Sequence, residues 1–171
     1  YQTTVNPIRQ DFQALIKSWW NELGVEVELK TIDPGVFFGG DAGSPDTFQK
    51  FYADVEMYAN NSDGPDPEVY LSNYLCSKIP SPETQWQGEN VNRFCDPAYD
   101  ALVAELSRTQ DPAQRGEIAR RLNDMLTRDG MVIVPLVHRG TLSARSNTLG
   151  GVAINAWDSE IWNTADWYRI K

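Results

Sequence analysis

The chain has 171 residues, of which 41% are hydrophobic and 11% aromatic, so it can bury the core of one compact domain and is not an intrinsically disordered chain. Its formal net charge of −9 argues against nucleic acid as a partner, because phosphate binding needs a basic face. No apolar run approaches membrane-spanning length. The chain begins at Tyr1 without a signal peptide, so we expect either a mature secreted protein or an excised piece of a longer one.

Helix and strand signals alternate along the first third of the chain. The Asn-Pro pair at 6–7 predicts a helix start and Gly24 predicts its end. Alternating valines and charged residues predict a half-buried strand over 25–32. The glycine-rich segment 38–45 lacks the Lys-Ser/Thr ending of a phosphate-binding loop. The first helix has one apolar face, with a tryptophan expected in the core: Ile8, Phe12, Leu15, Ile16, Trp19 and Leu23.

A turn-forming segment, Asn60–Pro67, carries two carboxylates between a strand-like run at 53–58 and a helix-like run at 68–75. Its glycine and prolines restrict the backbone. Two interpretations of Asp63 and Asp66 remain open. They can cap the turn and the following helix, or one of them can bind a cationic group from a loop of fixed shape.

Two further helices are predicted in the second half, starting at the Asp-Pro pairs 96–97 and 111–112, and the second ends at Gly130. The apolar run 131–137 predicts a strand at a sheet edge, and 167–170 predicts a final strand. The whole pattern is mixed α/β. We interpret the arginines of the last helix as a solvated surface paired with acids rather than as an anion site: Arg115, Arg120, Arg121 and Arg128 with Glu105, Glu117 and Asp124.

Cys76 and Cys95 enclose an irregular segment rich in Pro, Ser, Gln, Glu and Asn. Neither is part of a CxxC pair and the chain has one histidine, so a Cys/His zinc site cannot be assembled. One disulfide closing this loop is the simpler account, and two unpaired thiols in a cytosolic protein are the alternative. A disulfide would place the protein outside the cytoplasm.

Signals for catalysis are weak. A glycoside hydrolase needs two carboxylates at a defined separation, and Asp63 and Asp66 are two candidates among 24 acidic residues. The lone His138 has no Gly-x-Ser-x-Gly elbow to complete a triad. Trp157 and Trp162 could stack on a sugar, but packing within the protein is the favoured interpretation. We therefore expect a binding protein without cofactor or metal, and not an enzyme.

Several short motifs, none of them specific alone, occur together in an order that resembles the C-terminal part of the family 5 extracellular solute-binding proteins, the dipeptide- and oligopeptide-binding receptors of ABC importers. The likeness covers nearly all of the chain. The motifs are the helix, Leu-Gly-Val and strand unit over 1–27, Asp-Gly-Pro-Asp-Pro at 63–67, Tyr-Leu-Cys at 74–76, the run 88–102, Asp-Pro-Ala-Gln-Arg at 111–115 and Val-Pro-Leu-Val at 134–137.

The resemblance implies roles for individual residues. In dipeptide-binding members an aspartate in this loop pairs with the α-ammonium group of the ligand, and Asp63 occupies that position. The end of the preceding strand lines the ligand, which here means Tyr58, Ala59, Asn60 and Asn61. The family's cysteine pair matches Cys76 and Cys95 as a disulfide. Peptide binders usually carry Gly-Trp at the strand end, whereas this chain has Ala59-Asn60, so an oligosaccharide or a nickel chelate is an alternative ligand.

The resemblance also implies an architecture and a setting. Full-length members are two-lobed, so residues 1–138 would form the C-terminal ligand-binding lobe, a mixed sheet flanked by helices, and 139–171 would return toward the first lobe. The full-length protein would be periplasmic or extracellular, in some members as a membrane-anchored lipoprotein, and would deliver a peptide or small solute to an ABC permease. A fragment that exposes its lobe contact could self-associate.

Overall fold

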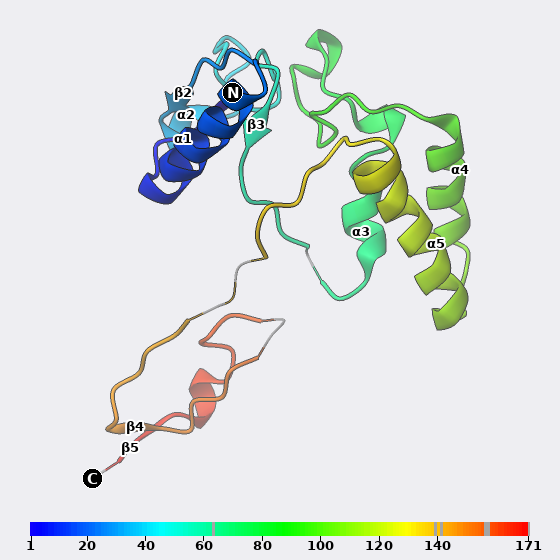
Figure 1. Ribbon diagram of the computed structural model, residues 1–171. Helices are drawn as coiled ribbons and strands as arrows, with labels where there is room; N and C mark the ends of the chain where they lie inside the picture. The colour runs from blue at the N-terminus through cyan, green and yellow to red at the C-terminus, as the bar shows by residue number, and fades with distance from the viewer. Residues whose placement is uncertain (63, 139, 141, 156–157, 171) are drawn as a thin grey trace.

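The computed structural model describes residues 1–62, 64–138, 140, 142–155 and 158–170. It is a mixed helix and sheet structure, as the alternating signals predict. Figure 1 shows a small sheet with α1 (Pro7–Glu22) beside it, a group of three helices, and a C-terminal segment that extends away from both. No helix among the described residues is long and apolar enough to cross a membrane.

The sheet has three parallel strands in the order β2-β1-β3, made by Lys30–Ile32, Gln2–Thr4 and Glu56–Met57. The central strand, β1, is polar in sequence but almost fully buried, because it pairs on both sides. Gln2 lies opposite Lys30 on one side and Glu56 on the other. The sheet therefore brings Glu56, at the start of β3, next to the first strand of the chain.

Helix α1 begins as predicted, with the Asn6 side chain accepting a hydrogen bond from the Arg9 backbone N–H at 3.2 Å. It ends at Glu22 with Leu23 as its C-cap, and Gly24 follows with a φ of 82°, a conformation that favours glycine after a helix end. The side chain that α1 turns inward is Gln13, whose amide donates to the Tyr1 carbonyl at 3.0 Å. The expectation that Trp19 lies in the core is wrong, because the apolar face points to solvent and Trp19 is 58% exposed.

Four more helices follow: α2 (Pro34–Phe37), α3 (Pro67–Ser72), α4 (Pro97–Leu106) and α5 (Pro112–Asp124). Each has an aspartate N-cap before a proline at its first position, which satisfies backbone N–H groups that the helix leaves unpaired. After α5 one π-helical turn, Met125–Asp129, leads to Gly130, where the helical path ends as predicted.

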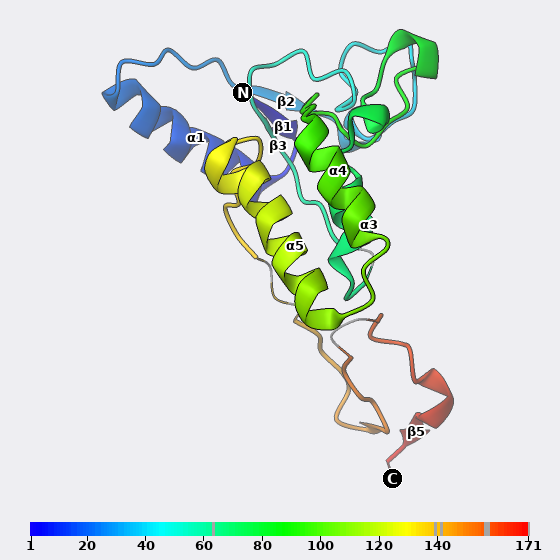
Figure 2. The same ribbon diagram turned by 90° about the vertical axis from the view of Figure 1, so that its right-hand side faces the viewer.

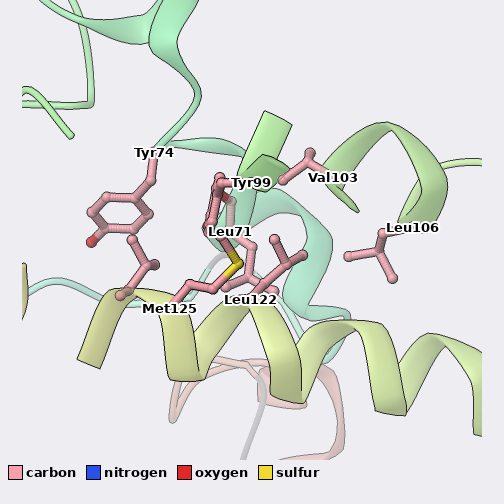
Figure 3. Close-up of a cluster of buried hydrophobic side chains, with 8 residues drawn as sticks. Leu71, Tyr74, Tyr99, Val103, Leu106, Leu122 and Met125 are labelled. Atoms are coloured by element: carbon pink, nitrogen blue, oxygen red, sulfur yellow. The ribbon is translucent and has the colours of Figure 1, made fainter. Parts of the chain in front are cut away.

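Helices α3, α4 and α5 pack around the main hydrophobic core (Figure 3). Tyr99 is fully buried, and its hydroxyl donates to the Leu71 carbonyl at 2.8 Å, so the phenol brings no unpaired polar group into the core. Figure 3 shows Leu122 of α5 and Met125 of the π-helical turn pointing toward Leu71 and Tyr99. The buried members are Leu71, Tyr74, Tyr99, Val103, Leu106, Leu122, Met125 and Leu126.

Cys76 and Cys95 form a disulfide, which confirms the prediction. The loop that they close contains two short 3₁₀ turns, Cys76–Lys78 and Pro82–Thr84. Asn90 is fully buried inside it, and its side-chain amide donates to the carbonyls of Tyr74, Leu75 and Phe94 at 3.0, 3.0 and 2.7 Å. The loop is thus attached to the chain just after α3 by the disulfide and by the hydrogen bonds of the buried Asn90 amide.

Predicted strands are shorter than expected or missing. The strand over 25–32 is reduced to β2, and that over 53–58 to β3. The predicted edge strand 131–137 does not form: within the described residues no strand pairs with it, and Val134 and Val137 are 66% and 62% exposed. An extended run needs a neighbour for its backbone hydrogen bonds, and apolar composition does not provide one.

The C-terminal segment contains β4 (Leu149–Gly150) and β5 (Tyr168–Arg169), which pair antiparallel. The predicted strand 167–170 is therefore present in a shorter form. Figures 1 and 2 both show residues 142–155 and 158–170 extending away from the sheet and from α3–α5. Trp162 is half exposed and its indole N–H donates to the Ala153 carbonyl at 2.8 Å. Trp157 lies outside the described residues.

Candidate functional site

The residues predicted to line a ligand lie in the 58–66 segment, which connects β3 to α3. In Figure 1 this segment crosses from the sheet to the three-helix group. Asp63, the predicted ligand-binding carboxylate, lies outside the described residues. The structure places Tyr58, Ala59, Asn60 and Asn61, and their surroundings define the described part of the site.

Tyr58 is half-buried at the start of the segment and is held by three phenylalanines. Its ring centroid lies 5.5 Å from that of Phe48, 6.2 Å from that of Phe37 and 6.3 Å from that of Phe38, all in edge-to-face orientations that aromatic pairs prefer. Burial, reinforced by the nearby Glu56 carboxyl, raises the pKa of Tyr58 above its usual range. The phenol therefore stays neutral and can act as a hydrogen-bonding group.

After Tyr58 the segment turns to solvent. Ala59, Asn60 and Asn61 are exposed. The Asn60 side chain accepts a hydrogen bond from the Asn61 backbone N–H at 3.0 Å, and the Ser62 hydroxyl donates to the Gly64 carbonyl at 2.7 Å. Both hydrogen bonds are local, since each joins groups one or two residues apart. The Asn60 amide N–H and the Asn61 side chain are on an accessible surface and can bond a polar solute.

Asp66 closes the segment and acts as the N-cap of α3, as predicted. Its carboxylate accepts the Glu68 backbone N–H at 2.9 Å. That hydrogen bond, with a smaller contribution from the Arg115 guanidinium, lowers the pKa of Asp66. Asp66 is therefore ionised and already bonded to the Glu68 backbone N–H and to Arg115. A ligand-binding role in this loop would fall to another carboxylate.

Arg115 is a site residue that sequence reasoning missed, since it was interpreted as one of several surface arginines. Its Nη2 lies 2.7 and 2.9 Å from the two carboxylate oxygens of Asp66 and 2.8 Å from Glu68 Oε2. Its Nη1 donates to the carbonyls of Leu106 and Thr109 at 2.7 and 2.9 Å. The predicted surface pairing holds for Arg120 with Glu117 and for Arg128, in the π-helical turn, with Asp124. Arg121 pairs instead with Asp129.

A second missed group, Glu56, lies two residues before the segment. One carboxyl oxygen accepts a hydrogen bond from the Gln2 side-chain amide, and the other, Oε2, is buried with no hydrogen-bond partner. Burial raises the pKa of Glu56 to about 7, although the Gln2 bond and the charge of Arg93 oppose the shift. Nothing in the sequence distinguishes this glutamate, because strand pairing alone buries it.

The described surface contains a hollow of about 190 Å³ beside the segment, lined by α3, α5 and the chain after Gly130. It includes Pro67 and Tyr70 of α3 and Ile133 and Pro135. Ligand pockets usually measure roughly 300–1,000 Å³, so this hollow does not enclose a complete ligand. Among the residues that the structure describes, no cluster of three His, Cys, Asp or Glu side chains is suited to a metal ion.

The chain is similar in sequence to several peptide-binding proteins of Pseudomonas aeruginosa. It is 24% identical to one named Dipeptide-binding protein, over 90% of this chain and 26% of that protein. It is 25% identical to Di/tripeptide-binding protein 3, over 80% of this chain and 23% of that protein. With Di/tripeptide-binding protein 4 the identity is 28%, over 60% of this chain and 18% of that protein.

This chain thus spans about a quarter of the length of these relatives, and it matches their C-terminal portion. No family model matches the chain, and no solved structure matches it. The predicted resemblance is confirmed: the chain is related to dipeptide- and di/tripeptide-binding proteins.

Proposed function

We propose that this chain is the ligand-binding lobe of a two-lobed solute receptor that captures a short peptide for an ABC importer, without catalysis or cofactor. The observation that carries the proposal is the similarity to Dipeptide-binding protein over 90% of the chain. The names of the relatives describe binding proteins and lend no support to an oligosaccharide receptor or a glycoside hydrolase. In this proposal the complete receptor is periplasmic or extracellular and works with a permease.

The 58–66 segment would form this lobe's part of the cleft. Tyr58 is a neutral phenol on an aromatic support, Asn60 and Asn61 are exposed amides, and Asp63 supplies the carboxylate for the peptide's α-ammonium group. Asp66 is already bound to Arg115 and to a backbone N–H, which favours Asp63 for this role. Residues 1–138 would form the lobe and 139–171 the return toward the other lobe. The other lobe would then complete the cleft, which would account for the small size of the hollow on the described surface.

Calorimetric titration of the full polypeptide that carries this sequence with L-Ala-L-Ala tests the proposal. N-acetyl-L-Ala-L-Ala, which lacks the α-ammonium group, should bind far more weakly. Truncating one partner of a buried charge pair costs roughly 2–5 kcal/mol, so Asp63→Asn should weaken L-Ala-L-Ala at least about tenfold. The matched control is Asp54→Asn, which changes an exposed aspartate four residues before the segment in the sequence.

Wild-type affinity in Asp63→Asn would show that the amine-binding role is wrong and would turn attention to a neutral solute. Release of product from a chromogenic glycoside would contradict the absence of catalysis, since a receptor binds its ligand without turnover.

A further inference from the structure

Arg115 joins three elements that meet beside the 58–66 segment. Two of its contacts are the Leu106 carbonyl, at the C-terminal end of α4, and the Thr109 carbonyl, three residues beyond it. Carbonyls at a helix end are unpaired within the helix and attract a cation. The other contacts, Asp66 and Glu68, are the N-cap and an acidic residue in the first turn of α3. The guanidinium therefore connects the end of one helix to the beginning of another.

The stability of α5 itself does not explain why position 115 is an arginine. It lies near the helix start, where the macrodipole disfavours a positive charge. No acid lies in the first turn of α5 to offset this, whereas two carboxylates from α3 bind the guanidinium directly. With five donors in a rigid plane, arginine can satisfy carbonyls and carboxylates together, which a lysine cannot do. These contacts, rather than helix stability, account for an arginine here.

We propose that Arg115 is the positioning residue of the ligand site: by binding Asp66 it fixes the end of the 58–66 segment and so determines where the segment presents its ligand-binding groups. This inference rests on the proposed function, in which Asp63 is the ligand-binding carboxylate. Asp63 stands three residues before Asp66 in the sequence. At its other end the segment is fixed by Tyr58 in the aromatic cluster. The segment is thus held at both ends, and Arg115 supplies the attachment on the helix side.

Arg120 of the same helix provides a matched control. It pairs with Glu117, one turn away within α5, and both side chains are well exposed. Arg115→Met and Arg120→Met therefore remove the same charge from the same helix, but only the first change removes a contact with the segment. Asp66→Asn adds a second probe, because asparagine keeps the helix cap and loses the ion pair.

Hydrogen exchange measured by mass spectrometry on the 171-residue chain is the first test. Arg115→Met should speed exchange of the Gly64, Asp66 and Glu68 amides by about tenfold, while the amides at 122–126, at the end of α5 and in the π-helical turn, keep wild-type rates. Arg120→Met should leave both regions unchanged. Adding Asp66→Asn to Arg115→Met should produce little further change, since both remove one interaction. Unchanged exchange at 64–68, or equal loosening of 122–126, would overturn the positioning role.

Titration of the full polypeptide with L-Ala-L-Ala is the second test. Arg115→Met should weaken binding several-fold and Arg120→Met should not. If Asp63→Asn binds L-Ala-L-Ala normally, the proposed peptide site fails even where the exchange result supports Arg115. If Asp63→Asn fails to bind while Arg115→Met binds like the wild type, the site stands and the positioning role of Arg115 is refuted.

Discussion

Glu56→Gln should stabilise this protein near neutral pH. Glu56 has a pKa of about 7 against an ordinary 4.5, because burial disfavours its charged form. An acid whose pKa is raised on folding binds its proton more tightly in the folded state. The free energy of unfolding is therefore highest below the unfolded pKa and decreases as pH rises from about 4.5 to about 7.

The magnitude follows from the same values. The difference between 4.5 and about 7 corresponds to at most about 3 kcal/mol, and partial exposure of the side chain reduces this to about 2 kcal/mol. Glutamine carries no charge at any pH and can still accept the hydrogen bond from Gln2. For a chain of this length, about 2 kcal/mol corresponds to a melting temperature roughly 4–8 °C higher.

Thermal unfolding followed by circular dichroism at about pH 5 and about pH 8 measures the effect, with Glu26→Gln, an exposed glutamate, as the control. We expect a gain for Glu56→Gln at the higher pH, little gain at the lower pH and no change for Glu26→Gln. A loss of stability in Glu56→Gln at the higher pH would refute the reasoning. It would mean that Glu56 is ionised and that its attraction to Arg93 outweighs the cost of burial.

Two further outcomes are expected. Replacing Cys76 and Cys95 together by serine should lower the free energy of unfolding by roughly 3 kcal/mol in urea denaturation, because the disulfide restricts the unfolded chain; two free thiols in denatured, unreduced wild-type protein would contradict the bond. In limited trypsin digestion we expect cleavage at Arg145, in the exposed segment, well before cleavage at Arg93, whose guanidinium donates to three backbone carbonyls. Cleavage at Arg93 first would contradict the observed arrangement.

Helix starts were predictable from the sequence because their signals are local. An Asn or Asp before a proline supplies both the cap and the preset backbone angle, and the helices α1, α4 and α5 begin at such pairs. The cysteine pairing was predictable for a similar reason, since one histidine left no metal site as an alternative. These inferences need only neighbouring residues or composition.

Strand lengths and helix burial were not predictable because they depend on partners. The run 131–137 has strand composition and pairs with no strand in the described part of the chain. The central strand β1 is buried although its residues are polar, since it pairs with β2 and β3. In α1 an amphipathic pattern predicted a buried Trp19, but the structure buries Gln13. Periodicity identifies a face and does not show what covers it.

Candidate site residues could be proposed from the sequence only where they are close together in the chain. The stretch 58–61 stood out because it precedes an Asp-rich turn that resembles a family motif. Arg115 lies 49 residues from Asp66, and Glu56 lies 54 residues from Gln2. Each of these contacts is made by tertiary packing between elements that carry no shared sequence signal. They are therefore visible only in the folded structure.

Two parts of this fold differ in how far apart in the sequence their contacting residues lie. The core of α3, α4 and α5 is contiguous in sequence, and its buried bond from Tyr99 to Leu71 spans 28 residues. Pairing of β1 with β3 brings together residues 54 apart. Each doubling of a closed loop costs roughly 0.6 kcal/mol more in chain entropy. We therefore expect the three-helix unit to fold before the sheet forms.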